Sequence, residues 1–226
     1  MPLAVPTSTR YRTKQEFVYR TLREAIMRCE LEPGQRLVID DLARTLEVSA
    51  IPVREALQLL QSEGLVLNVP HVGATVAPIS REAVYEVFSI MEGLETVATR
   101  SAAQRMTEAD AVLLGEIVTA MDRALEGGRH DAWADLNHQF HVAIGKLSAM
   151  PMLQDMTERV LSRWDRVRRY YFNGVLVHRV SQAQGEHREI LEAMRTRDLA
   201  RLERLVKQHN QGALQDYSEY LSQFAS

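Results

Sequence analysis

Four polar residues in the C-terminal part of the chain have the types and spacing of a metal site. Asn137 and His141 are four residues apart, so they share one face if this segment is a helix. His187 and His209 follow on later segments, and neighbouring helices of a bundle would bring them beside the first pair. Three imidazoles and one amide oxygen can bind a divalent cation, and imidazoles suit Zn²⁺, Ni²⁺, Fe²⁺ or Mn²⁺.

The same histidines also have an ordinary interpretation. The chain has seven histidines, and a scattered histidine is more often exposed, or hydrogen-bonded in a core, than bound to a metal. Asp135 and His138 are further candidates by type, but on a helix they fall on a different face from Asn137 and His141. We therefore expect Asp135 and His138 to lie outside the site.

The segments that carry these residues are predicted to be helices. From residue 80 to the C-terminus the sequence has almost no strand pattern, and apolar residues recur at helical spacing. Capping and helix-breaking residues divide this region into about six helices. These boundary residues lie at 107–110, 127–128, 150–151, 173–174 and 196–198. The expected architecture is an all-α antiparallel helical bundle.

The first 80 residues have a different pattern. Thr13 and Glu16 form a capping box before a first helix, and a short second helix is expected near residues 40–46. Ser49 is a good N-cap for a third helix that ends at Gly64. Two short strands follow, joined by a tight tip at residues 70–73. Three helices and a two-stranded hairpin are the order of a winged helix-turn-helix, which presents the start of its third helix to the DNA major groove.

The predicted fold is therefore mostly α, with an N-terminal winged helix-turn-helix and a C-terminal helical bundle. The expected boundaries are a flexible tail at residues 1–12, the winged helix-turn-helix at 13–78, a linker at 79–81 and an effector-binding and dimerisation domain at 82–222.

The third helix is expected to present Arg54 to DNA. Pro52 occupies the third helical position, where its missing N–H would have no intrahelical partner. Arg54 and Gln58 lie off the apolar stripe, and arginine is the commonest reader of guanine edges, although a surface ion pair with Glu55 or Asp41 is the alternative. His71 and Gly73, at the tip of the hairpin, are expected to reach the minor groove or a phosphate, or else to form only a polar turn.

Composition limits where such a protein would work. The single cysteine excludes an intramolecular disulfide and a cysteine-based zinc ribbon, which favours the reducing cytoplasm. No apolar run approaches the roughly 18 residues of a membrane helix, and the N-terminus lacks the pattern of a signal peptide. Because the net charge is −3, any DNA contact depends on the placement of a few basic residues rather than on bulk charge.

Short motifs in residues 13–78 resemble the head domain of the GntR family of bacterial transcription regulators. The matching pieces are Pro33-Gly34, Asp41-Leu42-Ala43, Val48-Ser49, PVREAL at 52–57, Glu63-Gly64-Leu65 and Gly73. The family commonly has an arginine and a threonine after the serine, and here these positions are Ala50 and Ile51. The resemblance therefore leaves more of the DNA contact to Ser49, Arg54 and the hairpin, and Ile51 is expected to contact a thymine methyl.

The C-terminal region resembles the effector domain called FCD, found in the FadR-type branch of that family. The matching pieces are EGLE at 92–95, Asn137-x-x-Phe140-His141, EHREILEA at 186–193, Asp198 and His209. Many members bind a metal through an Asp or Asn and three histidines in this order. The resemblance therefore implies Asn137, His141, His187 and His209 as ligands, with weaker binding than an aspartate would give.

A second departure concerns the effector. Relatives often have an arginine that can hold an effector carboxylate where this chain has Met91. Arg163 and Trp164 are the replacement candidates for binding the effector, although a solvated basic face with one packed tryptophan is an equally good interpretation.

The predicted function is a bacterial DNA-binding transcription regulator of the repressor type, not an enzyme. As a homodimer it would bind a palindromic double-stranded operator, with an affinity controlled by a small organic or sugar acid beside the metal. One alternative is a regulator for which the metal itself is the signal. A metal-dependent enzyme is the other, but we find no well-placed general base beside the histidines.

Overall fold

The computed structural model describes residues 13–171, 175 and 177–223 of the chain, which divides into two compact units, Met1–Ser80 and Arg81–Ser226. The predicted tail at residues 1–12 and the predicted break at 173–174 lie outside the described residues.

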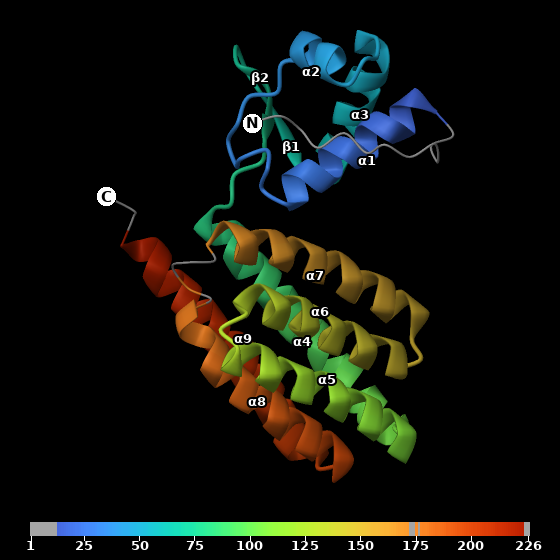
Figure 1. The fold of residues 1–226 in the computed structure, drawn as a ribbon, viewed down its shortest axis with the longest axis vertical. Coiled ribbons are helices and arrows are strands. Elements are labelled where there is room, and N and C mark those ends of the chain that lie inside the picture. The colour runs from blue at the N-terminus through green and yellow to red at the C-terminus, as the bar shows by residue number, and fades with distance from the viewer. Residues whose placement is uncertain (1–12, 172–174, 176, 224–226) are drawn as a thin grey trace. The chain divides into compact units, whose positions relative to one another are not determined.

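The first unit contains three helices followed by a two-stranded antiparallel hairpin (Figure 1). Its elements are α1 (Lys14–Met27), α2 (Ile39–Thr45), α3 (Ala50–Ser62), β1 (Val66–Val69) and β2 (Gly73–Val76). The helices enclose an apolar core, to which α1 contributes Val18 and Leu22 and α3 contributes Val53 and Leu60. This arrangement confirms the predicted winged helix-turn-helix.

Local signals explain where α1 and α3 begin. The hydroxyl of Thr13 accepts a hydrogen bond from the backbone N–H of Glu16 at 3.0 Å, as an N-cap should. Ser49 is the N-cap residue of α3 and has an extended backbone, but its hydroxyl makes no capping hydrogen bond. Pro52 is the third residue of α3 and is buried, so the proline is tolerated in the first turn and packs into the core.

The hairpin is short and has a strongly bent tip. Val66 pairs with Val76 and Val69 with Gly73, which leaves three residues between the strands. His71 and Gly73 both have positive φ angles, of 63° and 94°. Gly73 adopts this conformation without strain because it lacks a Cβ atom, and the tip can therefore turn tightly.

The second unit is a bundle of helices (Figure 1). Its described helices are α4 (Arg81–Arg105), α5 (Glu108–Glu126), α6 (His130–Leu147), α7 (Pro151–Tyr170), α8 (Val177–Arg195) and α9 (Leu199–Ser222). Helix α4 packs against α9, α7 and α6, while α8 packs against α9 and α5. The side of α6 that carries Asn137 and His141 thereby comes near α8 and α9. No helix among the described residues is long and apolar enough to cross a membrane.

Small residues allow the central helix to be surrounded in this way. On α4, Ala98, Ala102 and Ala103 are buried and belong to the main core of the unit. The same helix also carries one buried acid, Glu95, among buried residues that are mostly apolar. A buried carboxylate needs a partner to compensate for its lost hydration, and the partners of Glu95 identify the candidate site.

Candidate metal centre and nucleic-acid interface

Three buried histidines from three different helices come together inside the bundle. They are His141 on α6, His187 on α8 and His209 on α9, and one nitrogen from each lies within 4.8 Å of the others. Zinc–nitrogen bonds of about 2.1 Å in a tetrahedral site place donors about 3.4 Å apart. Small side-chain movements therefore suffice for all three imidazoles to bind one ion.

Carboxylates hold two of the three rings by their Nδ1 atoms. Glu95 forms an ion pair with His141 at 2.7 Å, and Glu186 lies 2.6 Å from Nδ1 of His209. With Nδ1 engaged in this way, Nε2 of each ring is left as the free donor atom. Metal-bound histidines usually have such carboxylate partners, which orient the ring and raise its basicity.

The third ring, His187, has no hydrogen-bond partner among the described residues. Its side chain is fully buried, and neither Nδ1 nor Nε2 is satisfied. Burial lowers the pKa of His187 well below its usual value, and the neighbouring His209 and His141 lower it further. His187 is therefore neutral, which is the form that binds a metal, and an ion would satisfy one of its two nitrogens.

The two carboxylates remain ionised although they are withdrawn from water. Burial by itself would raise the pKa of Glu95, but its contacts with His141 and Asn210 hold that pKa below its usual value. Burial likewise acts to raise the pKa of Glu186, and the hydrogen bonds from His209 and Arg179 outweigh it. Negative charge therefore faces the outer nitrogen of both imidazoles.

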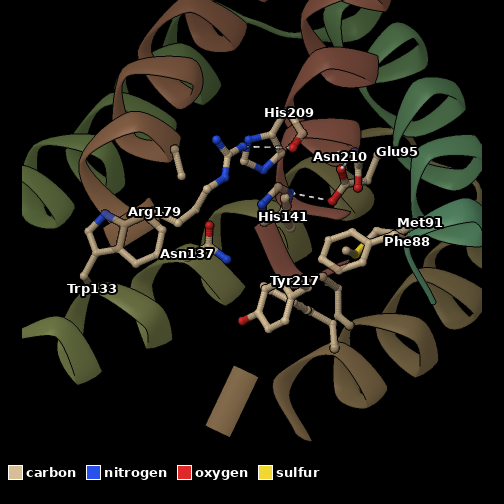
Figure 2. Close-up of a pocket in the computed structure, with 14 residues that line it drawn as sticks. Phe88, Met91, Glu95, Trp133, Asn137, His141, Arg179, His209, Asn210 and Tyr217 are labelled. Carbon is tan, nitrogen blue, oxygen red and sulfur yellow. Dashed lines mark hydrogen bonds and ion pairs between the residues drawn. The ribbon is translucent and has the colours of Figure 1, made fainter. Parts of the chain in front are cut away.

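A small cavity of about 30 Å³ lies beside the histidines. Figure 2 shows Asn137 and His141, both from α6, among its lining residues together with Arg179 from α8 and His209 from α9. This volume holds an ion and one or two water-sized groups. The residues fit a divalent metal site, because the donor set is three imidazoles and one amide and one imidazole is otherwise unpartnered.

Two acidic or imidazole side chains of α6 lie outside this cavity. Asp135 is exposed and lies 3.6 Å from Arg168, whereas His138 forms an ion pair with Asp165 at 2.9 Å. Both have charged partners on α7 rather than in the cavity. Asp135 and His138 therefore lie on a different side of α6 from Asn137 and His141, as expected from the sequence.

The effector residues expected on α7 are only partly brought to the cavity. Trp164 lines it and packs edge-on against Phe88 at a centroid distance of 4.9 Å. Arg163 is exposed and does not line the cavity, because successive residues of a helix point about 100° apart. Met91 also lines the cavity, and Arg179 is the one cation among its described lining residues.

Sequence reasoning did not identify Glu95, Glu186 or Arg179 as parts of the site. The available signal for Glu95 was an acid on a face of α4 that otherwise carries buried apolar residues. Glu186 directly precedes His187, but no spacing rule shows that its carboxylate reaches α9. The side-chain partners of these residues depend on contacts between distant helices.

Replacing Glu95 with glutamine is expected to weaken zinc binding by about 10–100-fold, because the neutral amide no longer orients and polarises His141. Titration against a competing chelator measures the affinity. Glu86→Gln is the matched control, since Glu86 is exposed on the same helix. Equal affinities of the two variants would show that the carboxylate has no such role.

The predicted DNA-contacting residues lie on the surface of the first unit. Ser49, Ile51, Arg54 and Gln58 are all exposed on or next to α3, and the side chain of Ile51 is 67% exposed. Arg54 forms no ion pair within the described part of the chain, so the alternative pairing with an acid is absent there. His71 is exposed at the tip of the hairpin.

Comparison with known proteins agrees with this two-part arrangement. Residues 14–76 match the profile described as bacterial regulatory proteins, gntR family, and residues 86–212 match that of the FCD domain. The chain belongs to the GntR family. This GntR-family chain is 30% identical to the HTH-type transcriptional repressor RspR of Escherichia coli over 206 residues, which cover 91% of this chain and 88% of RspR.

Two further relatives extend this comparison. The HTH-type transcriptional repressor GlaR of Escherichia coli is 28% identical over 198 residues, covering 84% of this chain and 90% of that protein. The solved structure of E. coli McbR/YncC is 25% identical, covers 95% of this chain and 100% of its own, and superposes with a TM-score of 0.71. These relatives are transcription regulators, and the GntR-family chain is a DNA-binding transcription regulator rather than an enzyme.

Proposed function

We propose that this GntR-family protein is a cytoplasmic repressor whose affinity for its operator is controlled by a small organic or sugar acid. The acid would bind beside a divalent metal ion in the helical unit. The observation that carries this proposal is the buried cluster of His141, His187 and His209, of which His141 and His209 line the cavity and are paired with Glu95 and Glu186.

The chain supplies four ligands to such an ion, namely the three imidazoles and the amide oxygen of Asn137. The ion would supply positive charge with open coordination positions, and a carboxylate oxygen is a suitable ligand for them. All four protein ligands would be neutral, so the charge of the cation would be offset only by Glu95 and Glu186 behind two of the imidazoles. Zinc, nickel, iron and manganese all accept this donor set.

The small cavity suggests how binding is coupled to DNA. A space of about 30 Å³ is too small for an ion together with a sugar acid unless the surrounding helices move. An effector that favours the expanded arrangement would shift the population of the bundle by its difference in affinity for the two states. Operator affinity would then change by the same coupling free energy, typically 1–3 kcal/mol.

On the DNA side, we propose a homodimer that binds two half-sites of a palindrome. One winged helix-turn-helix reads only a few base pairs, so pairing two heads about 34 Å apart increases both affinity and specificity. Ser49, Ile51, Arg54 and Gln58 would face the major groove, and His71 and Gly73 would contact the adjacent backbone or minor groove. The proposed direction, repression, follows from the similarity to RspR and GlaR, which are transcriptional repressors.

A metal-responsive regulator is the second candidate. The cavity has room for an ion and water with only small side-chain movements and no movement of the helices, which favours the metal alone as the signal.

One experiment separates the two functions. A duplex selected by the protein from a random DNA pool is titrated with metal-free protein, zinc-loaded protein, and zinc-loaded protein with acetate, lactate, malate or gluconate. The proposed function requires that at least one acid changes operator affinity by about 5–150-fold, and only when zinc is present. A change caused by zinc alone, with no effect of any acid, would favour the metal-responsive regulator.

A further inference from the structure

We propose that Arg179, on α8, is the residue that binds the carboxylate group of the effector. This inference rests on the proposed function and assigns its acid-binding residue. Met91 leaves an apolar side chain on the α4 side of the cavity, so the positive group must come from another helix. Arg179 is the one cation among the described residues that line the same cavity as His141 and His209.

The guanidinium of Arg179 is buried but only partly used. Its Nη2 atom donates to Glu186 at 2.8 Å and to the backbone carbonyl of His209 at 3.1 Å. Its Nε atom lies 3.2 Å from a carboxylate oxygen of Asp216 without the geometry of a hydrogen bond. Nη1 has no acceptor among the described residues, although the side chain is 95% buried.

A buried donor without an acceptor is unusual in a folded protein and indicates a missing partner. The missing partner of Arg179 must accept hydrogen bonds, and a planar carboxylate matches the fork of a guanidinium. Figure 2 shows the guanidinium beside the ring of His209, on the cavity side of the bundle. A carboxylate at this position can contact Arg179 with one oxygen and the ion bound by the histidines with the other.

Helix α9 is shaped to accommodate this guanidinium. A Cβ atom at Gly212 would lie 3.0 Å from Nη2 and 3.2 Å from Nη1 of Arg179. Because glycine in the middle of a helix is destabilising relative to alanine, its presence requires a compensating reason. Gly212 leaves room for the guanidinium of Arg179, a residue that also lines the cavity, to lie beside α9.

Contacts of Arg179 also connect the acid to the metal ligands. Arg179 and His209 share the carboxylate of Glu186, so the cation and the imidazole are held by one group. A carboxylate bound to Arg179 would therefore change the contact between Glu186 and His209 on α9. This linkage makes Arg179 a binding residue with an additional structural contact, and a test must separate the two roles.

The test compares Arg179→Gln with Arg188→Gln, an exposed arginine of the same helix that pairs with Asp122. Zinc affinity is measured first by chelator competition, and then binding of acetate to the zinc-loaded full chain is measured by calorimetry, with acetamide as the neutral probe. We expect zinc affinity within about tenfold of wild type for both variants. We expect acetate binding to fall by at least about tenfold in Arg179→Gln alone, with no change for acetamide.

Gly212→Ala provides a second variant that retains Arg179. Its methyl group should shift the guanidinium by a few tenths of an ångström and weaken acetate binding, whereas Gly185→Ala, on α8, meets no atom within 4 Å and should not. Acetate binding of Arg179→Gln equal to that of wild type would overturn the inference while leaving the proposed function intact. Failure of the wild-type protein to bind zinc, or to bind acetate when loaded with zinc, would overturn both.

Discussion

Replacing His187 with alanine should abolish specific binding of a divalent metal to the helical unit. His187 is the proposed ligand that is fully buried and has no hydrogen-bond partner among the described residues. Loss of a ligand should reduce zinc affinity by more than the roughly 10–100-fold that loss of an outer partner costs. In the wild-type protein, zinc at about 1,000 times its Kd should stabilise the fold by about 4 kcal/mol. The variant should show almost none of this stabilisation.

Thermal unfolding with and without zinc measures the effect. His178→Ala is the matched control, because His178 is an exposed histidine near the start of the same helix. The control should keep the zinc-dependent rise in Tm. A rise of equal size in His187→Ala would show that the metal binds elsewhere or not through this ring.

The same residue predicts a pH dependence in the metal-free protein. Burial lowers the pKa of His187 in the folded state, whereas the unfolded chain takes up its proton near pH 6.5. Below that pH the unfolded state binds more protons than the folded state, so stability falls as the pH falls. This part of the pH dependence should disappear in metal-free His187→Ala and remain in His178→Ala.

Replacing Arg54 with alanine should cause the largest loss of operator affinity among single changes in the first unit. A bidentate contact with guanine contributes about 1–3 kcal/mol, and a homodimer would lose two such contacts. Arg28→Ala is the matched control, since it removes the same charge at the end of α1, where Arg28 pairs with Glu24. Specific affinity should fall by roughly 5–150-fold per half-site for Arg54→Ala relative to this control.

Fluorescence anisotropy with the selected duplex and with unrelated DNA distinguishes base reading from charge. If Arg54 reads a base, the loss is concentrated on the selected duplex and preference at one base pair is relaxed. If it contacts only phosphate, affinity for both duplexes should fall equally and the salt dependence should become shallower. Affinities equal to those of Arg28→Ala would contradict any DNA contact by Arg54.

Much of the first unit could be predicted from local sequence. The signals there act over three or four residues, and each favours one local backbone conformation. They are the capping residue Thr13, the turn before Ser49, the tolerated Pro52 and the alternation around the hairpin. One difference was small: the hydroxyl of Ser49 makes no capping hydrogen bond, although Ser49 is the N-cap residue of α3.

In the helical unit, the sequence by itself determined which residue types were available and which pairs share a helix face. Four-residue spacing placed Asn137 and His141 together and excluded Asp135, because an α-helix repeats every 3.6 residues. Helical spacing could not show that Arg163 points away from the cavity while Trp164 lines it, since that depends on how α7 is rotated in the bundle.

Only the tertiary structure decided which groups meet. The convergence of His141, His187 and His209 depends on α6, α8 and α9 sharing one interior, and the pairing of Glu95 with His141 joins residues 46 positions apart. The guanidinium of Arg179 lies close beside Gly212 of another helix, where a Cβ atom would be only 3.0 Å from Nη2. Such contacts arise from the packing of helices distant in the chain, and local periodicity contains no information about their partners.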